Sequence, residues 1–265
     1  MMVDFEIFLF SHDTAYASAA MEAGVSGVVV DWECVGKDGR QKGYNTEVNH
    51  GQAADLQAMR SAATGPLFCR INNHPELREV EIRRAISAGA DEIWLPMVRD
   101  IGEVEACLNV IDGRVGLGVL VETQEALGLG RALSALPISH LYIGLNDLHI
   151  DQGRAQPFEA LVDGTVDAFR DTYDGALAFG GVTLPKLGDP LPQTLLLGAM
   201  ARLGCRFGVA RRSFRRDVPI IQLAESIDAI RRRFAVLSRR SALEVAADHD
   251  ALRRMVQAMR PVAAV

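Results

Sequence analysis

The sequence predicts a closed (β/α)₈ barrel, the TIM-barrel fold, with one additional helix at its carboxyl end. Short apolar runs of strand-like character alternate with helix-like runs along the whole chain. This is the order expected of parallel strands connected by helices. The chain has 265 residues, of which 49% are hydrophobic, enough for one large core of the size common in single barrels. Because no internal repeat, low-complexity segment or second domain interrupts the pattern, we expect one domain over residues 1–265.

Eight apolar runs are the predicted barrel strands, and eight is the number that closes a barrel of this type. Most are continuously apolar, which is typical of strands covered by helices. In chain order they are Phe5–Phe10, Gly27–Asp31, Leu67–Arg70, Glu92–Leu95, Val115–Val121, His140–Ile143, Ala178–Val182 and Arg206–Ala210.

Proline and glycine mark several of the predicted helix ends. Pro75 stands near the first position of HPELREVEIRRAISAG, and Gly89 comes just past its end. Gly24 and Gly204 end two further helices in the same manner. The segment WECVGKDGRQKGYNTEVNH is long and polar, so between residues 35 and 50 we expect a functional loop without regular structure.

The chain continues for about 55 residues after the last predicted strand, although a barrel needs only one helix there. Ser241 and Glu244 form a capping-box pattern before a final helix that ends near Met259. We expect this extension, about residues 239–265, to pack on a neighbouring subunit of a homo-oligomer.

Composition argues against several classes of partner. The net charge is −6 with acidic and basic residues interspersed, which disfavours nucleic-acid binding and attraction to membranes. No apolar run reaches the roughly 18 residues of a membrane helix, and the first residues predict a strand, not a signal peptide. The four cysteines lack metal-ligand spacing, so we expect reduced thiols in a cytoplasmic protein.

Two acidic side chains suggest the chemistry. Glu122 ends the strand-like run GVLVE, and Asp147 follows HLYIG in the turn LND. Adjacent strand ends face one mouth in a parallel barrel, so the two carboxylates can hold one hard divalent cation. Mg²⁺ is the expected ion, although oxygen ligands do not exclude Mn²⁺ or Co²⁺. A bound cation can polarise a carbonyl group and stabilise an enolate.

A series of motifs runs along the chain: DWE at 31–33, Arg70 at the end of strand three, LPMV at 95–98, VETQEA at 121–126 and YIGLNDL at 142–148. Their order resembles the HpcH/HpaI aldolase and citrate lyase β-subunit family over roughly residues 5 to 240. The resemblance implies a pyruvate-type barrel, trimers or hexamers with an exchanged final helix, and carbon–carbon bond chemistry through an enolate. It also implies that Glu122 and Asp147 bind the metal, that Arg70 stabilises the enolate, and that backbone N–H groups around Asn146 and Asp147 bind a substrate carboxylate.

The chain departs from this family at positions that concern proton transfer. Cys34 stands where the pyruvate aldolases have a histidine and the citrate lyase branch has an acidic residue, and the aspartate that partners this histidine falls near Ser87. The loop after strand eight is ARRSFRRD, where the family usually has small residues and one acidic residue. An unusual substrate or a different proton path is therefore expected.

Each polar residue at the ends of strands two and three has two possible roles, one functional and one structural. Arg70 would point into the mouth and donate to an enolate oxygen, or it would cap the rim. Asp31 and Glu33 share a face by the period of two, so Glu33 would contact the metal's waters, or both would form a buried pair bonded to arginine. Asn72 is either a second substrate contact or an ordinary turn asparagine.

His12 follows strand one in FLFSHD and is the histidine best placed to reach the mouth, so it could replace the missing family base. Bonding to the backbone at a helix start is its alternative role. His149, after NDL, is a second candidate base. Cys34 is read as a small space-filling residue in preference to a nucleophile, since an unshifted thiol is a poor base.

Substrate contacts are expected after strands seven and eight. Thr183 follows strand seven and should line the pocket. Arg211 and Arg212 follow strand eight, where barrels frequently bind phosphate, and would bind a second anionic group or coenzyme A. The alternative for these arginines is pairing with nearby carboxylates or with a neighbouring subunit.

Three functions remain open at this point. The first is a metal-dependent lyase of the class II aldolase type that acts on a small 2-keto acid. The second is a Claisen-type lyase or condensing enzyme, similar to citrate lyase β or to a citrate synthase, that uses a coenzyme A thioester. The third is a ligand-binding barrel without catalysis, which the missing base pair suggests.

Overall fold

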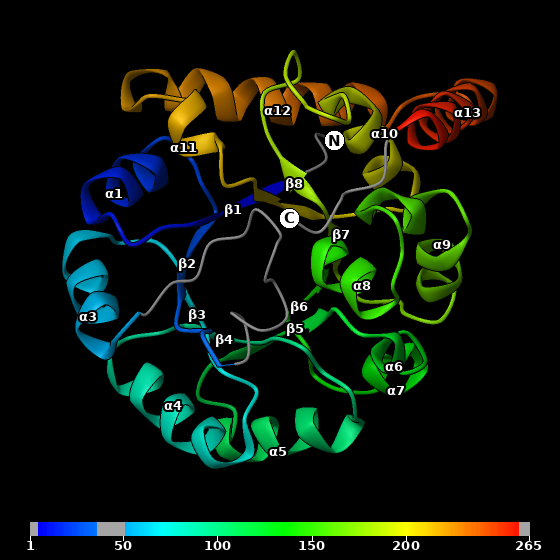
Figure 1. Cartoon of the computed structure of the whole chain (residues 1–265). Helices are drawn as coiled ribbons and strands as arrows, with labels where there is room; N and C mark the ends of the chain where they lie inside the picture. The colour runs from blue at the N-terminus through cyan, green and yellow to red at the C-terminus, as the bar shows by residue number, and fades with distance from the viewer. Residues whose placement is uncertain (1–4, 36–50, 260–265) are drawn as a thin grey trace.

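A computed structural model of the chain describes residues 5–35 and 51–259. Parallel strands form a barrel, and helices surround it in a ring (Figure 1). Neighbouring strands follow the order β7-β6-β5-β4-β3-β2-β1-β9-β8, so almost every strand pairs with the next one along the chain. This confirms the predicted (β/α)₈ architecture. The strands are β1 Glu6–Phe10, β2 Gly27–Asp31, β3 Leu67–Arg70, β4 Glu92–Leu95, β5 Gly116–Val121, β6 His140–Ile143, β7 Leu177–Phe179, β8 Gly181–Val182 and β9 Phe207–Ala210.

The seventh barrel strand differs from the single run predicted over 178–182. It is divided into β7, which pairs with β6, and β8, which pairs with β9. Gly180 lies between the two pieces with φ of 66°, a left-handed conformation that glycine adopts without steric penalty. One strand therefore bends at Gly180 and contacts both of its neighbours in the barrel with different segments.

The helical shell confirms most of the predicted ends. Gly24 and Gly89 have φ of 104° and 98° just past their helices, and Pro75 begins its helix. Ser241 and Glu244 form the predicted capping box. The helices are α1 Thr14–Glu22, α3 Ala53–Ala62, α4 Pro75–Ser87, α5 Ile101–Ile111, α6 Gln124–Leu127, α7 Gly130–Ser134, α8 Leu145–Asp151, η1 Pro157–Leu161, α9 Thr165–Arg170, α10 Gln193–Arg202, α11 Phe214–Asp217, η2 Ile220–Gln222, α12 Leu223–Leu237 and α13 Ala242–Ala258.

The additional carboxyl-terminal helix is present as α13, and it lies against α10 of the same barrel (Figure 1). Leu252 and Val256 are its buried residues, and the Gln156 side chain donates to the Val256 carbonyl at 2.6 Å. Leu243, by contrast, is 81% exposed. Packing of the extension on a neighbouring subunit stays a prediction. The loop predicted over 35–50 lies almost wholly outside the described residues.

The amino-terminal end of the barrel is filled by aromatic rings around one ionic cluster. Glu92 and His140 begin β4 and β6, and the His140 Nδ1 lies 2.9 and 3.0 Å from the two Glu92 carboxylate oxygens. Trp94 donates its indole N–H to the same carboxylate at 2.8 Å. A Cβ at Gly118 would lie 2.5 Å from the Trp94 ring, so the absence of a side chain on β5 makes room for this cluster. The rings of Phe8 and His140 pack edge to face with centroids 4.9 Å apart.

No helix in the described parts of the chain combines the length and the apolar character needed to cross a membrane.

Candidate functional site

Arg70 is the centre of an ionic cluster at the carboxyl end of the strands. It ends β3 directly opposite Asp31 in the β2–β3 register, so both side chains point the same way. The Arg70 Nε donates to one Asp31 oxygen at 2.9 Å and an Nη donates to the other at 2.7 Å, a bidentate pair. The second Nη lies 3.2 Å from a Glu33 carboxylate oxygen. The guanidinium also lies 4.8 Å from the centroid of the Phe10 ring.

Arg70 stays protonated although it is buried. Burial alone disfavours the guanidinium cation, but the carboxylates of Asp31 and Glu33 outweigh it and raise the pKa of Arg70 above its usual range. Both acidic side chains are buried and bonded to Arg70, which matches the alternative reading of the sequence for this pair. The predicted catalytic roles of Arg70 and Glu33 stay predictions.

Glu122 lies just past the end of β5 and is 3% exposed. One of its carboxylate oxygens accepts the backbone N–H of Met97 at 3.1 Å. The other faces Gly144 so closely that a Cβ there would lie 2.4 Å away. Burial, together with the negative charges of Asp147 and Glu33, raises the pKa of Glu122 to about 8, against the opposing effect of Arg70.

Asp147 comes close to Glu122 because the end of β6 is fastened to β5. The Gly144 N–H donates to the Val121 carbonyl at 3.1 Å, and α8 begins at the next residue. Asp147 lies in the first turn of α8 and is partly exposed, while Asn146 in the same turn is exposed. The negative charge of Asp147 is one cause of the raised Glu122 pKa, so the two carboxylates share one electrostatic environment.

This pair fits a hard divalent cation by its chemistry. Within the described residues, no cluster of three or more histidine, cysteine, aspartate or glutamate side chains has a metal-binding arrangement. Glu122 and Asp147 supply only carboxylate oxygens, the donors that Mg²⁺ prefers when substrate and water complete its shell. A cation would also remove the repulsion that raises the pKa of Glu122.

The arginines after β9 divide into two groups. Arg215 donates to Asp13 at 2.6 Å and Arg216 donates to Asp217 at 3.1 Å, which matches the pairing alternative for these two. Arg211 is partly exposed and donates to the Asp189 carbonyl at 3.0 Å. Arg212 is exposed.

Arg212 is close enough to the mouth to act on Tyr142 of β6. Burial and Glu122 raise the pKa of Tyr142, while the charges of Arg70 and Arg212 oppose that rise. Thr183 is fully buried just after β8, and its hydroxyl has no hydrogen-bond partner within the described residues. The predicted substrate contacts of Arg211, Arg212 and Thr183 stay predictions.

Asn72 holds the chain that follows β2. Its side-chain oxygen accepts the N–H groups of Cys34 and Val35 at 2.9 and 2.8 Å. Its side-chain nitrogen donates to the Trp32 carbonyl at 3.0 Å and to Glu81 at 2.9 Å. These four bonds explain why an asparagine is buried here without any substrate, and its predicted contact with substrate stays a prediction.

The candidate bases and the cysteine have different surroundings. His12 is exposed after β1, and a Cβ at Gly51 would lie 2.8 Å from its ring. His149 is buried, and burial lowers its pKa, which favours a neutral imidazole. Burial and Glu81 raise the pKa of Cys34, so its thiol stays protonated, as a space-filling role requires. Proton transfer by His12 stays a prediction.

Sequence reasoning missed the backbone of Met97. This residue has φ of 50°, in the left-handed region that side chains other than glycine rarely adopt. The motif LPMV reads as the end of an apolar strand and carries no signal for that conformation. Its N–H nevertheless supplies the hydrogen bond to Glu122 described above.

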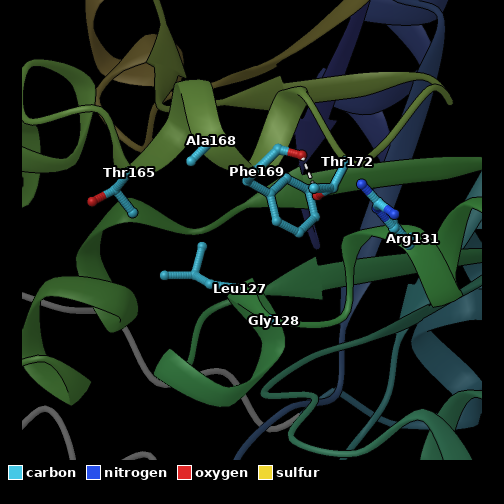
Figure 2. A pocket seen from close by; sticks show the side chains of 7 residues that line it. All are labelled: Leu127, Gly128, Arg131, Thr165, Ala168, Phe169 and Thr172. Atoms are coloured by element: carbon cyan, nitrogen blue, oxygen red, sulfur yellow. Dashed lines mark hydrogen bonds between the residues drawn. The ribbon is translucent and has the colours of Figure 1, made fainter.

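A separate cavity of about 410 Å³ lies in the helical shell, between the α6–α7 region and α9 (Figure 2). Leu127 and Phe169 form its apolar walls, and Thr165, Thr172 and Arg131 add polar groups. None of the predicted site residues lines it. The mouth of the barrel is therefore the candidate site.

Comparisons with known proteins support the fold. No protein-family model and no curated protein matches the chain. The crystal structure of the citrate synthase SbnG matches with a TM-score of 0.58 and 15% identity, over 79% of this chain and 88% of that one. RipC from Yersinia pestis matches with a TM-score of 0.54 and 17% identity, over 92% and 100% of the two chains.

A third solved structure is 3-keto-L-gulonate-6-phosphate decarboxylase from Vibrio cholerae O1 biovar El Tor. Its TM-score is 0.58 and its identity is 14%, over 88% of this chain and 99% of that one. Identities this low establish the shared barrel and nothing finer, because one barrel fold supports many chemistries.

Proposed function

We propose that this chain is a metal-dependent carbon–carbon lyase that cleaves or forms a 2-keto-4-hydroxy acid through a pyruvate-type enolate. The observation that carries the proposal is that one end of the barrel holds both a charged Arg70, bonded twice to Asp31, and two mutually repelling carboxylates. These carboxylates are Glu122 and Asp147. The names of two fold neighbours, a citrate synthase and a decarboxylase, support carbon–carbon bond chemistry by analogy only.

Glu122 and Asp147 would hold the divalent cation, with Mg²⁺ as the first candidate and Mn²⁺ or Co²⁺ as alternatives. When bound, such a cation supplies electrophilic stabilisation of the charge that develops on the keto oxygen. The protein's own contribution is to orient Glu122. The Met97 N–H holds one of its oxygens, and Gly144 leaves room for the other.

Arg70 stabilises the enolate oxygen in this proposal. Asp31 and Glu33 engage three of its five N–H groups, as far as the described residues show, and the other two are available to a substrate oxygen. Because the guanidinium is already oriented, little reorganisation is needed when the negative charge develops. Glu33 thus acts by holding Arg70, and backbone N–H groups near Asn146 and Asp147 receive the substrate carboxylate.

Cleavage requires one proton to leave and one to return. The hydroxyl on C4 loses its proton, the C3–C4 bond breaks, and its electron pair forms the enolate while an aldehyde departs. The enolate then takes a proton at C3 and becomes the 2-keto acid. His12 is the proposed acceptor and donor of these protons, because it is an exposed imidazole just past Ser11, which follows β1.

A coenzyme A thioester substrate is the second candidate, and the arginines after β9 are its specific support. Arg212 is exposed near Tyr142, and Arg211 is partly exposed beside it, so both guanidinium groups can bind a phosphate. With the smaller substrate, Arg211, Arg212 and Thr183 would contact a second anionic group.

Proton exchange on pyruvate in D₂O, followed by NMR, tests the first proposal against the second. With Mg²⁺ or Mn²⁺ we expect loss of the methyl signal, and EDTA should abolish it. The Glu122→Gln protein is the matched control, because it keeps the side-chain shape while removing one ligand charge. Absence of exchange with every metal would exclude the pyruvate enolate, and acetyl-CoA would then be tested. Binding of metal and keto acid without turnover would indicate a non-catalytic barrel.

A further inference from the structure

The loop between β4 and α5 contains the left-handed residue Met97, whose N–H donates to Glu122. An ordinary side chain resists this backbone conformation, so surrounding contacts must hold it. The contact at the Met97 carbonyl comes from Asn73, whose side-chain nitrogen lies 3.3 Å away. The same peptide segment is thus held from outside by Asn73 and contacts Glu122 inside the mouth.

Asn73 can make this contact in only one orientation. Arg78 donates two hydrogen bonds to the Asn73 side-chain oxygen, at 3.1 and 2.7 Å. Arginine is only a donor, so the oxygen must face Arg78 and the NH₂ group must face the opposite side. There it meets two acceptors, the Met97 carbonyl and the Glu103 carboxylate at 3.3 and 3.0 Å. Glu103 in turn accepts the Arg99 N–H of the same loop at 2.9 Å.

We propose that Asn73 is a positioning residue that holds Met97 in its left-handed conformation, so that the Met97 N–H fixes Glu122 for binding a divalent cation. The role of the cation rests on the proposed function, whereas the link from Asn73 through Met97 to Glu122 rests on the contacts alone. Met97 acts through its backbone, and Asn73 touches neither the cation nor the substrate.

The test compares the wild type with Asn73→Asp, Met97→Gly and the double variant. Asn73→Asp keeps the size of the side chain and its bonds from Arg78, but it places an oxygen against the Met97 carbonyl and Glu103. We expect about tenfold weaker Mn²⁺ binding by calorimetry, in the range found for residues that support metal ligands. Met97→Gly keeps the N–H and adopts a positive φ without penalty, so it is the reference against which the double variant is compared.

The double variant separates positioning from general damage to the loop. Glycine at position 97 does not resist the left-handed conformation. The double variant should therefore recover most of the Mn²⁺ affinity that Asn73→Asp loses. Asp100→Ala is the control, because it removes the N-cap of α5, where Asp100 accepts the Gly102 N–H at 2.7 Å, without touching Met97 or Asn73. It should lower stability while Mn²⁺ affinity stays unchanged.

Crystal structures of the variants give a readout that needs no metal. In Asn73→Asp we expect φ of residue 97 to leave the left-handed region and the Glu122 carboxylate to move. Unchanged Mn²⁺ affinity in Asn73→Asp, or a double variant as weak as Asn73→Asp, would overturn the positioning role. If the wild type bound no Mn²⁺, the proposed function would fail. The positioning role would then be rejected only if Glu122 had not moved in the Asn73→Asp crystal structure.

Discussion

The two ends of the barrel both contain buried charge, but they balance it differently. At the amino end, Glu92 accepts bonds from His140 and Trp94, and the rings of the core surround the cluster. At the carboxyl end, Arg70 contacts Asp31 and Glu33, while Glu122 remains under the repulsion of Asp147 and Glu33.

The pKa shifts express the same difference. The carboxylates of Glu6 and Glu92 overcome the effect of burial and raise the pKa of His140 to about 9, so the amino-end cluster favours its charged form. At the carboxyl end, burial and neighbouring charge act against the ionised form of Glu122. A (β/α)₈ barrel commonly uses its amino end for stability and its carboxyl end for chemistry, and charge balance separates the ends in the same way here.

Removing a carboxylate from the mouth should have the largest effect. Glu122→Gln and Asp147→Asn each remove one of two proposed ligands, so turnover should fall at least about a thousandfold, with Mn²⁺ binding weakened in parallel. The metal-free Glu122→Gln protein should be at least as stable as wild type at pH 9, because it lacks the unfavourable buried charge. Calorimetry and urea unfolding check both statements. Wild-type metal affinity in both variants would end the ligand assignment.

A substitution in the Glu92–His140 cluster at the amino end of the barrel should change the free energy of unfolding. With a folded pKa of about 9 against an ordinary value of 6.5, the stabilisation from charged His140 is complete below about pH 6.5 and is lost as the pH rises through 9. His140→Gln should therefore lower the free energy of unfolding by about 3 kcal/mol at neutral pH. It should leave kcat unchanged.

His12→Gln is the matched control for that experiment, because His12 is an exposed histidine at the other end of the barrel. Urea unfolding between pH 6 and 10 should show no effect of this change on stability, while turnover falls. If the His140→Gln and wild-type proteins had the same pH dependence of unfolding, the account of the amino-end cluster would be wrong.

Arg70→Lys tests the charge balance within the mouth. Lysine keeps the charge but cannot bond to both Asp31 oxygens and to Glu33 in the same planar arrangement. Turnover should fall about a hundredfold with little change in KM for the metal, because the proposed role of Arg70 is to stabilise the developing enolate. Steady-state kinetics with titrated Mn²⁺ separates the two effects, and normal turnover would remove Arg70 from the mechanism.

Gly144→Ala should give the smallest effect. Its new Cβ would lie 2.4 Å from a Glu122 oxygen, so the carboxylate must move. We expect about tenfold weaker Mn²⁺ binding. Gly128→Ala is the control for loss of a glycine, because its φ of −76° suits alanine and its Cβ would meet only the Glu125 carbonyl oxygen, at 3.4 Å. An unchanged affinity in Gly144→Ala would show that Glu122 tolerates displacement.

The barrel was predictable because its signals are local. Continuous apolar runs and glycine or proline at helix ends located β2, β3, β4 and β6 to the residue. Gly180 gave no such signal, since a glycine within GG before VTLP reads equally well as part of one strand. The division of the seventh strand depends instead on which neighbour each half meets.

The mouth was predictable only in outline. The position of Asp31 and Arg70 at strand ends suggested their meeting, because parallel register brings such ends together. The Glu92–His140 pair joins residues 48 positions apart, and the bonds of Asn73 join three separate segments, so neither follows from sequence spacing. The left-handed Met97 likewise depends on tertiary contacts that override local preference.

The bend at Gly180 should determine where the barrel opens locally. Each half of the seventh strand is short, and each is hydrogen-bonded in register to a single neighbour, β6 or β9. Native-state hydrogen exchange should therefore find the strand amides with lowest protection near this bend, since a short ladder opens with less loss of bonding. Thr183 comes directly after β8, and Arg211 comes directly after its neighbour β9. Local opening there would widen the rim on one side without unfolding the opposite wall, where Arg70 and Glu122 are held.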